Sequence, residues 1–268
     1  GIQIAHAGRK GSTKNPWKIG NRHEKQDVKD GDGGWQTVAP SAVPFSADSR
    51  VPRELTIDEI KAIQDKFADA ARRAASAGFK WLEIHAAHGY LLHSFYSPLS
   101  NFRKDEYGGS FENRVRMLLE TVTKVKAVWP ANLPLTVRLS ASDWTEGGWT
   151  VDDSVKLAKL LKDLGVDLID CSSAYVRGGD HYPYGPSWQV PLAKQVKALA
   201  GIATGAVGMI TEPEQANKII EDGQADLIFI ARESMREPQW PYKAALALGA
   251  EIVPEAKSVL PKNYSYAL

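Results

Sequence analysis

The sequence is poor in the features that mark several large classes of protein. Its single cysteine, Cys171, excludes intrachain disulfides and a metal cluster held by cysteines alone. Lys and Arg total 33 against 32 for Asp and Glu, and no long block of one sign points to nucleic acid. No apolar run approaches the roughly 18 residues that cross a membrane, and the N-terminus has no signal-peptide pattern. We therefore expect a soluble, cytoplasmic protein with neither a nucleic-acid nor a membrane partner.

The chain also has no recognisable linker. No stretch rich in Pro, Ser or Gly divides its 268 residues, so we expect residues 1–268 to form a single domain. The first residues, Gly1-Ile-Gln-Ile-Ala-His6, enter an apolar, strand-like run directly and without an initiator methionine. This beginning leads us to expect an N-terminally incomplete domain.

From residue 54 onward, short apolar runs alternate with longer amphipathic segments, which is typical of βα units around a parallel sheet. A capping box, Thr56 with Glu59, predicts where the first long helix begins. Ser110, and Thr150 with Asp153, give the same signal for the next two. The predicted strands are 2–5, 81–84, 135–139, 167–171, 202–206 and 226–230. The predicted helices are 56–77, 110–130, 150–165, 191–200, 212–222 and 238–248.

These elements fit two α/β architectures. An open, doubly wound sheet usually carries G-x-G-x-x-G after its first strand, and no predicted strand here ends in that motif. We therefore favour a (β/α)₈ TIM barrel, in an N-terminally truncated version with about six of its eight βα units. Residues 10–50 then form a long loop over the mouth of the barrel.

Two imidazoles and a phenol follow the second predicted strand in the sequence His85-Ala-Ala-His88-Gly-Tyr90. Catalytic groups of (β/α) barrels lie at this end of the strands. If the segment is helical, residues three apart share a face, and both imidazoles can point at one carbonyl oxygen. The alternatives are half of a metal site and a purely structural pair. Metal is disfavoured because Glu83 lies within the strand and no third ligand follows at zinc-like spacing.

Two polar residues interrupt other predicted strands. Arg138 lies among apolar neighbours and needs an anionic or electron-rich partner, either a cofactor or a core carboxylate such as Asp143 or Asp170. Gln3 can both donate and accept, as the edge of a heterocyclic cofactor requires, although a hydrogen bond to backbone would also satisfy it.

The last two predicted strands end in Thr204-Gly-Ala-Val-Gly208 and in Ile230-Ala231-Arg232. Barrels of this kind build phosphate sites there, where backbone N–H groups and a guanidinium suit the anion. Tight packing is the alternative explanation for the small residues. Cys171 ends an apolar strand, and we expect a buried, unreactive thiol.

Four stretches, 1–10, 83–90, 97–110 and 203–209, together resemble the old yellow enzyme family of NADH:flavin oxidoreductases. They look closest to its bacterial NADPH dehydrogenase and xenobiotic reductase branch. The pairing of His85-Ala-Ala-His88-Gly-Tyr90 with Asp105-Glu-Tyr-Gly-Gly-Ser110 is highly specific. The resemblance covers nearly the whole chain and implies a barrel that lacks the family's first two βα units.

The resemblance implies an ene-reductase with FMN as bound cofactor and NADPH as reductant, which reduces α,β-unsaturated carbonyl compounds by a ping-pong hydride transfer. By matching positions, His85 and His88 hold the substrate carbonyl and Tyr90 donates a proton to the α-carbon. Gln3 and Arg138 match contacts to the isoalloxazine, and Gly208, Ala231 and Arg232 match the phosphate site. No metal is implied, and homo-oligomers are compatible with the resemblance.

Two other readings stay open. Related barrels reduce dienoyl thioesters or nitro compounds. The segment 172–190, with Tyr175, His181, Tyr182, Tyr184 and Trp188, is expected to line the mouth and decide between substrates. A truncated barrel fragment that binds no flavin and has no activity of its own is the second. The sequence does not separate NADPH from NADH.

Overall fold

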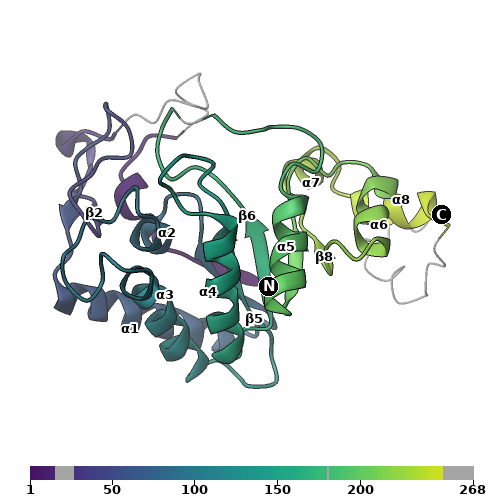
Figure 1. The fold of residues 1–268 in the computed structure, drawn as a ribbon, viewed down its shortest axis with the longest axis horizontal. Helices are drawn as coiled ribbons and strands as arrows, with labels where there is room; N and C mark the ends of the chain where they lie inside the picture. The colour runs from purple at the N-terminus through teal and green to yellow at the C-terminus, as the bar shows by residue number, and fades with distance from the viewer. Residues whose placement is uncertain (16–26, 180, 250–268) are drawn as a thin grey trace.

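A parallel, six-stranded sheet forms the centre of the protein in a computed structural model that describes residues 1–15, 27–179 and 181–249 (Figure 1). The strand order is β1-β4-β5-β6-β7-β8, and every neighbouring pair is parallel. The strands are β1 (Ile2–Ile4), β4 (Leu82–Ala86), β5 (Leu135–Ser140), β6 (Leu168–Ser172), β7 (Ala203–Ala206) and β8 (Leu227–Ile228). All six predicted strands are thereby confirmed, with shifts of one or two residues at their ends.

The long helices follow the strands as predicted. They are α1 (Ile57–Ser76), α3 (Phe111–Lys126), α4 (Val151–Asp163), α5 (Val190–Ala200), α6 (Pro213–Glu221) and α8 (Trp240–Ala247). The capping boxes at Thr56 and Thr150 are both formed, and Ser110 caps α3. Helices α1, α3, α4 and α5 stand next to one another against the sheet, while α6 and α8 lie together at one end (Figure 1).

Several short elements were not predicted. Strands β2 (Val38–Ala39) and β3 (Arg53–Glu54) form a small parallel pair, and two 3₁₀ turns, η1 (Gly8–Lys10) and η3 (Asp30–Asp32), lie in the loop that the sequence left unstructured. The short helices α2 (Leu91–Tyr96) and α7 (Arg232–Arg236) were missed as well. Residues 16–26 of the predicted loop lie outside the described residues.

Successive side chains of each strand point to opposite faces of the sheet. In β4, Leu82 and Ile84 belong to the hydrophobic core, whereas the alternate residues Glu83 and His85 are buried polar side chains on the other face of the strand. The parallel register then places His85 beside Arg138, and Arg138 beside Asp170. One layer of the sheet interior is therefore polar and ionisable, which an ordinary packed core does not require.

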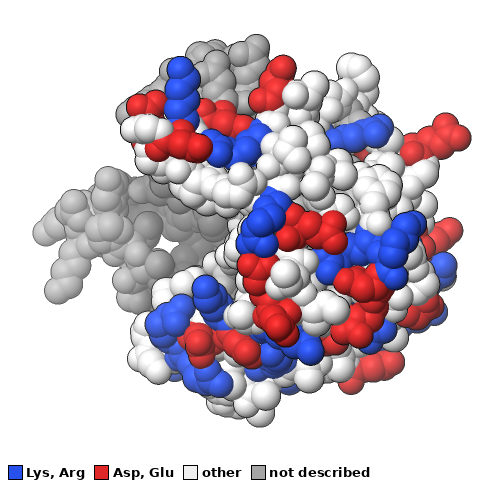
Figure 2. All heavy atoms as spheres, turned by 90° about the vertical axis from the view of Figure 1, so that its left-hand side faces the viewer, with Lys and Arg blue, Asp and Glu red and all other residues white. Residues whose placement is uncertain are grey.

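Within the described residues, β1 pairs only with β4 and β8 only with β7, so six strands are joined and the two outer ones are edges. None of the described helices is long and apolar enough to cross a membrane. Basic and acidic side chains are interspersed on the face that carries α1 and β2 (Figure 2), in keeping with the balanced charge of the sequence.

Candidate active site

The predicted catalytic residues come together where β4 ends. His85 lies inside the strand and is only 6% exposed, while His88 and Tyr90 lie in the turn that follows. The ring centroid of His85 is 5.2 Å from that of His88 and 5.3 Å from that of Tyr90. The side chains of His88 and Tyr90 thus both pack against the His85 ring.

The segment 85–90 is not helical, so the geometry that we considered for the two imidazoles is corrected. Strand β4 continues to Ala86, and α2 begins only after Tyr90. His88 and Gly89 have φ angles of 58° and 69°, a left-handed conformation that a right-handed helix excludes. The histidines are close because the chain turns back, not because they are one helical turn apart.

Two side chains from distant segments hold this turn. The backbone N–H of His88 donates to Oγ of Ser140 at 2.9 Å, and Nζ of Lys10 donates to the carbonyl oxygen of His88 at 2.6 Å. The Lys10 ammonium also lies 4.9 Å from the centre of the Tyr90 ring, within the range of a cation–π contact. Sequence reasoning missed both residues; the signal available for Ser140 was its place at the end of a predicted strand.

Burial and nearby cations keep both imidazoles uncharged at neutral pH. Desolvation, helped by Arg138, lowers the pKa of His85 to about 3. The same two causes hold the pKa of His88 well below its usual value. A neutral imidazole carries one N–H donor and one acceptor nitrogen. Nε2 of His88 lies 2.6 Å from Oγ of Ser172, and Nδ1 of His85 is buried without a partner.

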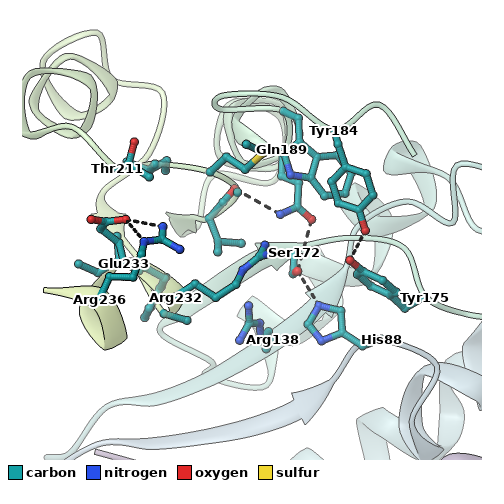
Figure 3. Close-up of a pocket in the computed structure, with 18 residues that line it drawn as sticks. His88, Arg138, Ser172, Tyr175, Tyr184, Gln189, Thr211, Arg232, Glu233 and Arg236 are labelled. Atoms are coloured by element: carbon teal, nitrogen blue, oxygen red, sulfur yellow. Dashed lines mark hydrogen bonds and ion pairs between the residues drawn. The ribbon is translucent and has the colours of Figure 1, made fainter. Parts of the chain in front are cut away.

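A cavity of about 420 Å³ opens beside this turn (Figure 3). It collects five of the eight predicted site residues, which come from four strand ends: His88, Arg138, Gly208, Ala231 and Arg232. Arg138 and Arg232 point into the same space from β5 and α7 (Figure 3). His85 and Tyr90 lie behind His88 and do not line the cavity, and neither does Gln3.

Arg138 has a core carboxylate as its neighbour. Its Nε lies 3.1 Å from Oδ2 of Asp170, but the angle does not make a hydrogen bond, and Oδ1 of Asp170 has no partner. Desolvation therefore outweighs the arginine and raises the pKa of Asp170 to about 7. The alternative partner, Asp143, instead binds His93. The Arg138 side chain therefore lies between the Asp170 carboxyl and the cavity that it lines.

The side-chain amide of Gln3 is hydrogen-bonded to a carboxylate of the neighbouring strand. Its Nε2 donates to Oε1 of Glu83 at 2.7 Å, across the β1–β4 pair. The backbone hydrogen bond considered as an alternative is replaced by this side-chain bond, and contact of Gln3 with a flavin stays a prediction. Cys171 is fully buried, and desolvation raises its pKa well above the usual value, as expected for an unreactive thiol.

Aromatic side chains close one side of the cavity. Tyr175, Tyr184 and Trp188 line it, as predicted for the segment 172–190, whereas His181 and Tyr182 of the same prediction are not among the lining residues. The phenols of Tyr175 and Tyr184 are hydrogen-bonded to each other, and the rings of Tyr184 and Trp188 lie 5.0 Å apart between centroids (Figure 3). Such a wall favours flat, conjugated ligands.

Another part of the cavity lining is suited to a phosphate. Gly208 has a φ of 118°, and a Cβ there would come within 2.8 Å of the Gln189 amide, so only glycine fits. Arg232 adds a guanidinium close by. Three arginines line the cavity, and one of them, Arg236, is paired with Glu233. Together with the aromatic wall and an imidazole, they fit a flat, anionic cofactor that carries a phosphate group. Residues Gly208, Ala231 and Arg232 would hold the phosphate, and Arg138 the ring system.

A parallel α/β sheet with such a cavity at its carboxyl edge defines the class of flavin-binding barrel oxidoreductases. Residues 1–251 match the model of the NADH:flavin oxidoreductase / NADH oxidase family. NADPH dehydrogenase of Geobacillus sp. (strain WCH70) is 49% identical over 252 residues, which are 94% of this chain and 67% of that protein. NADPH dehydrogenase of Bacillus subtilis (strain 168) is 46% identical over 94% of this chain and 68% of its own.

Solved structures of reductases have a similar fold. Morphinone reductase in complex with tetrahydroNAD is 26% identical with a TM-score of 0.70, covering 95% of this chain and 68% of its own. The 2-naphthoyl-CoA reductase complex is 26% identical with a TM-score of 0.77, covering 92% of this chain but 37% of its own.

The chain belongs to the NADH:flavin oxidoreductase / NADH oxidase family. The resemblance to old yellow enzyme and the (β/α) barrel, represented here by six of its strands, are confirmed. The family is one of oxidoreductases, and its cofactors are FMN and NADPH.

Proposed function

We propose that the chain carries the active site of an ene-reductase, which takes hydride from NADPH onto FMN and delivers it to the C=C bond of an α,β-unsaturated carbonyl compound in a ping-pong cycle. The observation that carries the proposal is the uncharged His88 imidazole in the wall of a cavity that also contains Arg138, with the His85 imidazole and the Tyr90 phenol packed directly behind it. When bound, FMN supplies the hydride chemistry. Side chains of this protein would bind the substrate, polarise its carbonyl group and donate the proton.

The histidines would bind the substrate carbonyl. Each neutral ring offers one N–H to an oxygen, and a donor that carries no charge polarises the carbonyl without needing a proton from solution. Nδ1 of His85 has no protein partner, and Nε2 of His88 lies beside the Ser172 hydroxyl, which leaves Nδ1 of each ring as the nitrogen that could face a ligand. As hydride reaches the β-carbon, negative charge builds on the oxygen, and these N–H groups stabilise it.

Tyr90 would supply the proton that completes the reaction. Its ring lies against His85, with 5.3 Å between the ring centroids, and this neighbourhood supports a role for its O–H in protonating a substrate held by the histidines. A tyrosine O–H within reach of the α-carbon can act as a general acid. Arg138 would hold the electron-rich edge of the flavin ring and favour its anionic reduced form.

The proposal is tested by anaerobic titration of the FMN-loaded protein. NADPH should bleach the flavin absorption, and 2-cyclohexenone should restore it with one equivalent per flavin. Tyr90→Phe should slow reoxidation by the enone far more than reduction by NADPH. Reoxidation by an enoyl thioester or a nitroarene, but not by cyclohexenone, would favour one of the other reductase chemistries. A protein that retains no FMN would exclude catalysis by this chain alone.

A further inference from the structure

A buried histidine–carboxylate pair lies next to the catalytic turn, residues 87–90. Nε2 of His93, in α2, is 2.9 Å from Oδ1 of Asp143, and both side chains are completely buried. Neither residue lines the cavity. A buried ionisable pair costs desolvation free energy that an apolar pair of similar size would not cost, so its presence calls for an explanation beyond stability.

The Asp143 carboxylate is held in one orientation. Oδ1 accepts from His93, while Oδ2 accepts from the Ser97 hydroxyl at 2.7 Å and from the backbone N–H of Trp149 at 2.8 Å. These donors come from α2 and from the loop between β5 and α4. Asp143 therefore ties the segment that follows β4 to the segment that follows β5.

The other side of the His93 ring reaches the catalytic turn. The backbone N–H of Gly89 donates to Nδ1 of His93 at 2.8 Å. An N–H can only donate, so Nδ1 must present its lone pair, and the ring proton must then reside on Nε2, which donates to Asp143. The pair fixes the tautomer of His93 in the same way that a carboxylate fixes a metal-binding or catalytic histidine.

The turn needs this acceptor. His88 and Gly89 are consecutive residues in the left-handed region, which is unfavourable for His88 because its Cβ comes close to the following carbonyl oxygen. Their backbone N–H groups both bind side chains: His88 donates to Ser140, and Gly89 donates to His93. Without the acceptor, a buried N–H would lose its partner, and the turn would relax toward a conformation that moves the flanking His88 and Tyr90.

We propose that the His93–Asp143 pair is a positioning device: by accepting from Gly89 N–H through a fixed tautomer, it holds the His88 imidazole and the Tyr90 phenol where the substrate carbonyl needs them. The positioning of the turn follows from the hydrogen bonds alone, whereas its effect on catalysis rests on the proposed ene-reductase function. The two parts call for separate measurements.

Two amide variants separate the two halves of the His93 ring. In His93→Asn, the side-chain oxygen can stand near the place of Nδ1 and accept from Gly89, while the bond to Asp143 is lost. In His93→Gln, the longer side chain can place its NH₂ near Nε2 and keep the bond to Asp143, while Gly89 loses its acceptor. The variants are alike in polarity and differ in which bond survives.

The first measurement needs no turnover. Hydrogen exchange of the Gly89 amide in the FMN-loaded holoenzyme should be as slow in His93→Asn as in the wild type and at least tenfold faster in His93→Gln. Equal exchange in both variants would overturn the positioning of the turn. Thermal unfolding of each variant, measured in parallel, shows whether a change in exchange comes from global destabilisation.

The second measurement compares two oxidants of the chemically reduced holoenzyme in stopped flow. Reoxidation by cyclohexenone needs the carbonyl site, whereas reoxidation by O₂ does not. We expect His93→Gln to slow the enone reaction at least tenfold and the O₂ reaction less than twofold, and His93→Asn to restore the enone rate to within about threefold of the wild type. Equal losses with both oxidants would mean a merely structural pair. A wild type that O₂ reoxidises and the enone does not would instead refute the proposed function, and the exchange result would still decide the positioning.

Discussion

The buried Asp170 carboxyl should make the stability of this protein depend on pH in an unusual direction. Its pKa of about 7 lies above the value of 3.8 for an exposed aspartate, because desolvation outweighs the attraction of Arg138. A group whose pKa is raised by folding stabilises the native state fully below the unfolded pKa, and this contribution disappears as the pH rises through the folded pKa. Asp170→Asn removes the titration altogether.

The size of the effect follows from linkage. Between pH 5 and 7 the unfolded chain carries an ionised Asp170 while the native protein keeps it protonated, and each pH unit changes the free energy of unfolding by about 1.4 kcal/mol. From pH 5 to pH 8 the wild type should therefore lose about 3 kcal/mol through this residue, and Asp170→Asn should lose none of it. Loss of the Arg138 partner shifts the variant by an amount that hardly varies with pH, so the slope carries the test.

Urea unfolding followed by circular dichroism at pH 5, 6, 7 and 8 measures this slope. Asp163→Asn makes the same change of charge at an exposed position in the last turn of α4 and serves as the control. The difference in unfolding free energy between Asp170→Asn and the wild type should move in favour of the variant as the pH rises, and that of Asp163→Asn should stay flat. Parallel curves for Asp170→Asn and the wild type would refute the reasoning.

Two further predictions concern the catalytic turn. His85, with a pKa of about 3, should keep the ¹⁵N chemical shifts of a neutral imidazole down to pH 5, and a titration midpoint near 6.5 in NMR spectra would contradict its burial. Gly89→Ala puts a Cβ 2.3 Å from the carbonyl oxygen of Tyr175 at a φ of 69°, and we expect a loss of more than about 2 kcal/mol in urea unfolding, with loss of enone reduction. Gly78→Ala, at a φ of 87° with nothing within 4 Å, should cost only about 1 kcal/mol; equal losses for the two would refute the steric argument.

The sequence by itself determined the elements and the family. Alternating apolar runs and amphipathic segments gave all six strands, and capping residues such as Thr56 and Thr150 gave the helix starts, because these signals are local. The motif His85-Ala-Ala-His88-Gly-Tyr90 located the candidate site for the same reason, since its three side chains are only five residues apart. Short elements such as α2 and β2 escaped, because they are too brief to show a period.

The tertiary structure alone decided which side chains interact with one another. Two aspartates were equal candidates for Arg138, and only the register of β5 with β6 selected Asp170 and left Asp143 to His93. Lys10 reaches the catalytic turn across 78 residues of sequence. Parallel strands bring such distant positions to one edge, and desolvation there sets which groups are charged, so neither partners nor pKa values can be read from spacing along the chain.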